Sequence, residues 1–140
     1  MNTSGQQSQD VTLLVDIANV MGSRPDGWWR DRAGAATRLL TELAPLAGAE
    51  VSLPDEPRMV RLAEVRAVVE GSANRTDGPE TVTVLRAQWD GDAEIVAEAD
   101  RLTAAGRTPL VVTADRGLRR RLPQPAIVVG PGWLNRLLGR

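Results

Sequence analysis

The sequence contains no cysteine, histidine, lysine, phenylalanine or tyrosine, and all 17 basic residues are arginine. Without cysteine there is no disulfide, no thiolate nucleophile and no sulfur-ligated zinc. Without histidine there is no Ser-His-Asp triad. Without lysine there is no GxxxxGK[ST] phosphate loop and no Schiff-base amine. The remaining reactive groups are carboxylates, hydroxyls, amides and guanidiniums, an inventory that favours a divalent metal ion bound by oxygen atoms.

Long hydrophobic runs are also missing. No apolar segment approaches the roughly 18–20 residues of a membrane span. The first ten residues, MNTSGQQSQD, lack the basic start and apolar stretch of a secretory signal. We expect residues 1–10 to be a disordered tail and residues 11–140 to form a single domain, since 42% apolar and 25% charged residues are typical of a globular protein. We expect the protein to reside in the cytoplasm, which fits the absence of cysteine.

Short apolar, β-branched runs predict strands that are buried on both faces. Between them, apolar residues recur at helical spacing, with Glu94, Glu98 and Arg101 expected on a solvated helix face. This alternation predicts an α/β fold with three α/β/α layers and a mainly parallel sheet of about five strands. The expected strands cover residues 11–16, 65–71, 81–87, 109–115 and 126–130, and the expected helices lie within 28–48, 92–106, 116–123 and 131–140.

Aspartates follow three of these strands. Asp16 ends the first strand, Asp115 ends the strand 109–115, and Asp90 and Asp92 come just after the strand 81–87. Because the carboxyl ends of parallel strands meet at one edge of a sheet, we expect these acids to lie close together. Like charges raise one another's pKa values, and a hard cation such as Mg²⁺ relieves that repulsion. The sequence therefore predicts a metal site at this edge.

Each acid also has a structural interpretation. Asp92 and Asp115 are placed to cap the helices that follow them, by accepting hydrogen bonds from backbone N–H groups. Asp16 is placed to form a tight turn with Asn19. These alternatives stay open at the level of the sequence.

Four blocks carry a resemblance to a known family: LLVDIANVMGSRPDGWW, GDAEIV, VVTADRGLRRRL and VVGPGWLNRLL. In their order and spacing they resemble the PIN-like nuclease superfamily, and within it the NYN branch of small actinobacterial proteins. Asp16 and Asn19 match the Asp and Asn of that branch's first strand. Asp92 matches the acid at the start of the helix after the third strand, and Asp115, with Thr113 beside it, matches the acid of the T-x-D block.

The resemblance implies a metal-dependent ribonuclease that hydrolyses RNA phosphodiester bonds with Mg²⁺ or Mn²⁺ as its cofactor. It implies that Asn19 orients Asp16 or a phosphate oxygen, and that Thr113 holds a water. It also implies a homodimer, because PIN-like domains often pair. The candidate catalytic residues are Asp16, Asn19, Asp92 and Asp115, and the candidate metal ligands are Asp16, Asp90, Asp92 and Asp115.

Charge is uneven along the chain, although the net charge is only −1. Residues 87–100 hold five acids and no arginine, whereas residues 111–140 hold six arginines and one acid. A basic flank beside an acidic pocket suits a polyanionic substrate, although a solvated helix face explains the arginines equally well. The candidate substrate-binding residues are Arg24, Thr113, Arg116, Arg119 and Arg120.

The four tryptophans are the only aromatic residues. Trp28 and Trp89 are candidates for stacking on unpaired bases. The alternative for Trp28 and Trp29 is that they anchor the loop or the core, and Trp133 is expected in the core.

Two other functions stay open. A non-catalytic RNA-binding or regulatory module with a partly degraded metal site is favoured by Gly91-Asp92-Ala93, because relatives tend to carry Gly-Asp-Asp there. A phosphohydrolase acting on nucleotides or other small phosphates would use the same acids without a basic surface.

Overall fold

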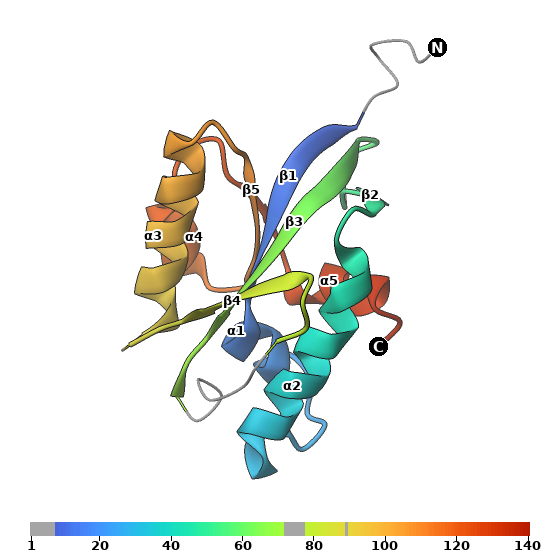
Figure 1. The fold of residues 1–140 in the computed structure, drawn as a ribbon, viewed down its shortest axis with the longest axis vertical. Coiled ribbons are helices and arrows are strands. Elements are labelled where there is room, and N and C mark those ends of the chain that lie inside the picture. Colours follow the sequence, from blue (N-terminus) through green and yellow to red (C-terminus); the bar gives the residue numbers. More distant parts are fainter. Residues whose placement is uncertain (1–7, 72–77, 89) are drawn as a thin grey trace.

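A computed structural model describes residues 8–71, 78–88 and 90–140, and shows a central β-sheet between two layers of helices (Figure 1). This arrangement confirms the predicted three-layer α/β/α fold. The candidate Trp89 and residues 1–7 lie outside the described residues. One face of the sheet is covered by α1 (Ile17–Gly22), α2 (Arg32–Leu43) and α5 (Pro131–Leu137), and the other by α3 (Gly91–Ala104) and α4 (Arg116–Arg121).

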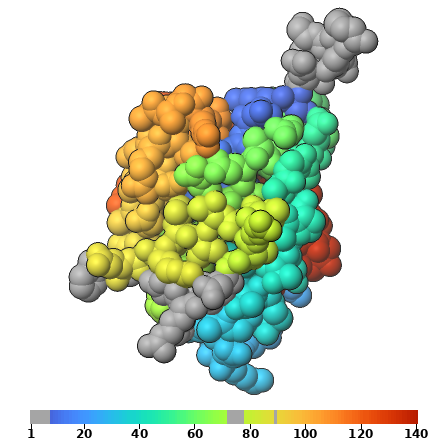
Figure 2. Space-filling model, in the orientation of Figure 1, coloured from blue at the N-terminus to red at the C-terminus, as the bar shows by residue number. Residues whose placement is uncertain are grey.

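The sheet has six strands in the described residues, of which all but one pair in parallel. Its order is β2-β3-β1-β5-β6, with β4 pairing with the second half of β3. Figure 2 shows β4 on the front surface, between α3 and α2. The strands are β1 (Gln9–Asp16), β2 (Glu50–Ser52), β3 (Met59–Val69), β4 (Val82–Arg86), β5 (Pro109–Val112) and β6 (Ile127–Val129).

The central strand β1 is buried from Val11 to Asp16 because helices pack on both of its faces. Leu13 faces the core beneath α1, α2 and α5, whereas its neighbour Leu14 faces the core beneath α3 and α4. Both side chains are fully buried, and each contributes about 1.5–3 kcal/mol relative to exposure. This packing holds the end of β1, and therefore Asp16, in one place.

The strand boundaries differ from the prediction at the starts of β1 and β3 and at the end of β5, which stops at Val112, so Asp115 lies in the turn before α4 and not in the strand. β1 begins at Gln9, so Gln9 and Asp10 belong to the sheet and not to the expected disordered tail. β3 begins at Met59, six residues before the expected start at Val65. The first half of β3 alternates between exposed and buried residues, because the sheet there is covered on one face. Such alternation is typical of a strand covered on one face, whereas the prediction rested on continuous apolar runs.

The polar face expected on α3 is also partly wrong. Glu98 is 2% exposed and forms ion pairs with Arg66 of β3 and with Arg101 of α3. These contacts hold the pKa of Glu98 below its usual range in spite of its burial. Glu94 is half-buried and pairs with Arg101. Of these charges, Glu98 joins α3 to β3 through Arg66, whereas Glu94 and the exposed Arg101 pair within α3.

Among the described residues, none of the helices combines the length and the apolar character that crossing a bilayer requires. Trp133 lies in the core as expected, at 8% exposure, and its indole N–H donates to the carbonyl of Ser52 at 3.0 Å. This bond joins α5 to Ser52, the last residue of β2.

Candidate active site

Asp16 lies at the carboxyl end of β1 and is only 5% exposed. It is the N-cap of α1, because Oδ1 accepts the backbone N–H of Asn19 at 3.3 Å. The turn expected with Asn19 is therefore present, and it begins a helix that the sequence analysis did not predict. The other carboxylate oxygen, Oδ2, accepts the hydroxyl of Thr113 at 3.4 Å.

Thr113 connects Asp16 with Asp115. Its hydroxyl oxygen accepts the backbone N–H of Asp115 at 3.1 Å while donating to Asp16. Asn19 holds the same loop from the other side, because its Oδ1 accepts the backbone N–H of Ala114 at 2.9 Å. The structure therefore places Asn19 and Thr113 as residues that position the loop after β5. Thr113 is 3% exposed, so its hydroxyl lies beneath the site.

Asp115 caps α4, as the structural interpretation proposed, since Oδ1 accepts the backbone N–H of Leu118 at 3.0 Å. The predicted cap of α3 was misplaced by two residues. Asp90 is the N-cap and accepts the backbone N–H of Ala93 at 3.1 Å, whereas Asp92 lies inside the first turn. Asp92 is thus left to face its acidic neighbours, among which it contacts Asp115.

Glu70 is a fifth acid in this region, and sequence reasoning missed it. It follows the last residue of β3, and β3 is the parallel neighbour of β1. Its Oε2 accepts the backbone N–H of Gly91 at 2.6 Å, which joins the end of β3 to the start of α3. A Cβ atom at position 91 would overlap this carboxylate oxygen, so glycine is needed for the contact. The pattern of an acid directly after a strand could have identified Glu70.

The acids at this edge of the sheet raise one another's pKa values. Burial raises the pKa of Asp16 from 3.8 to about 6; the backbone hydrogen bond from Asn19 lowers it, and the charges of Asp92 and Glu70 raise it further. Burial also raises the pKa of Asp92, followed by the charges of Asp115 and of other nearby acids. We call Asp16, Glu70, Asp92 and Asp115 the acidic cluster. Across residues 8–71, 78–88 and 90–140, no arginine forms an ion pair with any of its four members.

The donor chemistry of the acidic cluster fits a hard divalent cation, because its groups are carboxylates without a neutralising partner in the described chain. The arrangement is not that of a finished metal cage. Among the described residues, no group of three acidic side chains is close enough to hold a metal ion as it stands. Oxygens of Asp16, Glu70 and Asp115 are each engaged by backbone N–H groups. The cluster is therefore a set of potential ligands that requires side-chain adjustment to share one ion.

Four arginines lie on α4, which begins directly after Asp115. Arg116, Arg119, Arg120 and Arg121 are all exposed, and within the described part of the chain none of them pairs with a carboxylate. Their guanidinium groups are free to bind an external anion. Arg24, which follows α1, is half-buried.

Trp28 and Trp29 lie in the turn before α2 and differ in exposure. Trp29 is 50% exposed, while Trp28 is half-buried against the core. The two rings meet edge to face, with centroids 5.8 Å apart. Anchoring of the loop, one of the two interpretations of these residues, is correct for Trp28.

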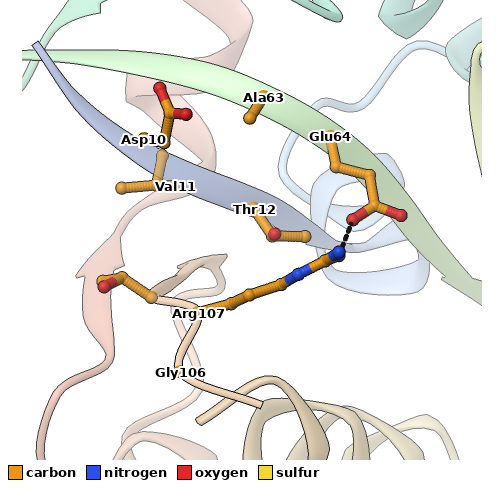
Figure 3. A pocket seen from close by; sticks show the side chains of 8 residues that line it. Asp10, Val11, Thr12, Ala63, Glu64, Gly106 and Arg107 are labelled. Atoms are coloured by element: carbon orange, nitrogen blue, oxygen red, sulfur yellow. Dashed lines mark hydrogen bonds and ion pairs between the residues drawn. The ribbon is translucent and has the colours of Figure 1, made fainter.

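A cavity lies far from these acids, at the other end of β1. Figure 3 shows it between the beginning of β1, the middle of β3 and the turn before β5, with a volume of about 480 Å³. Arg107 extends across it and pairs with Glu64 at 2.5 Å. The segment that follows α3 lines this cavity, and the charged groups of the cavity already have partners.

The sequence matches no protein-family model and no curated protein. A solved structure that is similar is that of Rae1 (YacP) from Bacillus subtilis, determined for a point mutant. The two chains are 19% identical; the match covers 92% of this chain and 75% of that one, with a TM-score of 0.65. The fold is PIN-like. At this level of identity the likeness concerns the course of the chain, and the chemistry has to be argued from the residues.

Proposed function

We propose that this chain is a metal-dependent ribonuclease that hydrolyses RNA phosphodiester bonds at the acidic cluster. The observation that carries the proposal is the convergence of Asp16, Glu70, Asp92 and Asp115, from four segments of the chain, on the carboxyl edge of a PIN-like sheet. Grouping acids without a neutralising arginine among the described residues costs stability, and the cost is understandable if the cluster serves a bound cation.

In this proposal, Asp16, Asp92 and Asp115 hold Mg²⁺ or Mn²⁺, with Glu70 as a further ligand or as a base for bound water. When bound, the metal lowers the pKa of a water molecule and neutralises charge on the phosphate. Thr113 and Asn19 keep Asp16 and the loop of Asp115 at a fixed separation. No histidine or lysine is needed, which agrees with the composition.

RNA binding would fall to α4 and its exposed arginines. Arg116 directly follows Asp115, so its guanidinium can reach a phosphate that lies over the acidic cluster. Arg119 and Arg120 lie one turn further along the helix and would contact neighbouring phosphates. Binding through these groups should weaken steeply as salt is added. The homodimer and the cytoplasmic location stay predictions.

A second candidate function is a non-catalytic RNA-binding module that retains the fold and the arginines. Two observations favour it: no three acids among the described residues stand at metal-binding separation, and Ala93 occupies the position where relatives tend to carry a second acid. In that case RNA would bind at α4 and remain intact.

The test is cleavage of a single-stranded RNA by the purified protein with Mn²⁺, with Mg²⁺ and with EDTA. The variants are Asp16→Asn and Glu70→Gln, with Glu64→Gln as a matched control because Glu64 lies in the same strand, at the other end of the sheet. The proposal predicts metal-dependent cleavage that Asp16→Asn abolishes, that Glu70→Gln lowers about 10- to 100-fold and that Glu64→Gln leaves unchanged.

Two other results would replace the proposal. Salt-sensitive RNA binding without cleavage under any metal condition would support the non-catalytic module. Release of phosphate from mononucleotides, with RNA left intact, would support a small-molecule phosphohydrolase.

A further inference from the structure

A second cavity opens directly beside Glu70, on the face of the sheet covered by α1 and α2, and has a volume of about 110 Å³. Its walls are Ile17, Ala18 and Met21 of α1, together with Trp28. Arg32 and Glu70 supply its charged groups. The cavity therefore adjoins the acidic cluster through a shared residue.

The chemistry of this cavity is that of a nucleobase site. Trp28 offers an aromatic surface, and the guanidinium of Arg32 lies 5.3 Å from the centroid of its ring. Unpaired bases stack on aromatic rings and on guanidinium planes. The Arg32 N–H groups can donate to a base carbonyl, and Glu70 has a second carboxylate oxygen that can accept from a base N–H group.

The volume selects one ring over two. A protein cavity of about 150 Å³ holds a benzene molecule. A cavity of about 110 Å³ is smaller than that, so a single six-membered ring enters it with one edge remaining outside. The fused double ring of a purine would leave a larger part outside, so the cavity favours a pyrimidine.

We propose that this cavity binds the pyrimidine base of the nucleotide next to the phosphate that is cleaved at the acidic cluster. The inference rests on the proposed function for the position of the cut, but the base preference itself requires no metal. Stacking on one aromatic side chain corresponds to roughly 5- to 150-fold in affinity. The arginines of α4 would add affinity that is independent of the base.

The first test is fluorescence anisotropy in EDTA with labelled rU10, rC10 and rA10. The expected result is binding of rU10 and rC10 about 10-fold more tightly than rA10. Ala18→Leu, which fills the cavity without removing a wall, should reduce this ratio below about 2-fold. Ala104→Leu is the matched control, because Ala104 is an exposed alanine at the end of α3 that does not line the cavity; it should leave the ratio unchanged.

A second measurement does not depend on any variant. An RNA carrying 4-thiouridine is crosslinked to the wild-type protein, and the modified peptide is mapped. Crosslinks within residues 17–32 or at residues 70–71 support the inference, whereas crosslinks confined to other segments overturn it. A wild-type protein that binds all three oligonucleotides equally, or a preference that survives Ala18→Leu, also overturns it.

The position of the cut separates this inference from the proposed function. Cleavage with Mn²⁺ next to pyrimidines supports both. Cleavage without a base preference overturns the inference and leaves the ribonuclease proposal intact. If no RNA is cut while rU10 and rC10 remain preferred, the proposed function fails and the base site stands, because the binding assay contains no metal.

Discussion

Asp16 should make the metal-free protein less stable, since its carboxylate is buried among other acids. The replacement Asp16→Asn removes the charge and keeps an oxygen that can accept the N–H of Asn19. The pKa of Asp16 rises from 3.8 to about 6 on folding. At 1.36 kcal/mol for each pKa unit, ionised Asp16 costs about 3 kcal/mol above pH 6.

The pH dependence has a definite sign. Between about pH 4 and pH 6 the folded state binds more protons at Asp16 than the unfolded state does. The free energy of unfolding of the wild type should therefore decrease as pH rises through that window. Asp16→Asn should be about 3 kcal/mol more stable than wild type at pH 7 and nearly equal to it at pH 4.

The assay is urea denaturation in EDTA, followed by the fluorescence of the buried Trp133 and the other tryptophans. Asp100→Asn serves as control, because Asp100 is an exposed aspartate of α3. Equal or lower stability of Asp16→Asn at pH 7, or a stability difference that does not depend on pH, would refute the electrostatic reasoning.

Three further predictions follow from contacts in the structure. Gly91→Ala should displace the flexible Glu70 carboxylate and break its hydrogen bond with the backbone N–H of residue 91, lowering the free energy of unfolding by about 0.5–1.5 kcal/mol in urea titrations, whereas Gly130→Ala, where an added Cβ meets no atom within 4 Å, should be nearly neutral; equal effects would contradict this. Glu98→Gln should cost about 1–3 kcal/mol in the same titrations, because it weakens the charge-assisted hydrogen bonds with Arg66 and Arg101 while Arg66 keeps Glu64 as a partner, and should leave RNA cleavage unchanged when the protein is folded. Arg120→Gln should reduce the slope of log affinity against log salt by about one in anisotropy titrations, and an unchanged slope would show that RNA does not bind at α4.

The buried strands of the fold could be predicted from the sequence because their apolar runs are continuous. The stretch 11–15 of β1 and the whole of β5 are covered on both faces, so Thr12 is the one polar residue among them. The first half of β3 was not predicted in this way, because the sheet around it is covered on one side and its buried apolar residues alternate with exposed ones such as Arg61. The short strand β2 pairs antiparallel with that half, and its three residues carry almost no pattern.

The residues of the candidate site also differ in whether a local sequence pattern could predict them. Asp16, Asp92 and Asp115 could be predicted because each follows a recognisable strand, and the structure brings them together. Glu70 was not predicted, because the sequence defines the strand before it only weakly. Glu98 was placed in solvent because the sequence does not show that Arg66 lies opposite it across the interface between α3 and β3. Contacts between distant segments depend on topology, which a local pattern does not contain.

The measurement that tests the central claim most directly is calorimetric titration of Mn²⁺ into the wild-type protein, Asp16→Asn and Glu64→Gln at pH 7. A cation centre built from the acidic cluster predicts saturable binding to wild type and to Glu64→Gln, and its loss in Asp16→Asn. If wild type takes up no Mn²⁺, or if Asp16→Asn binds it equally well, the acids at this edge of the sheet do not form a metal centre.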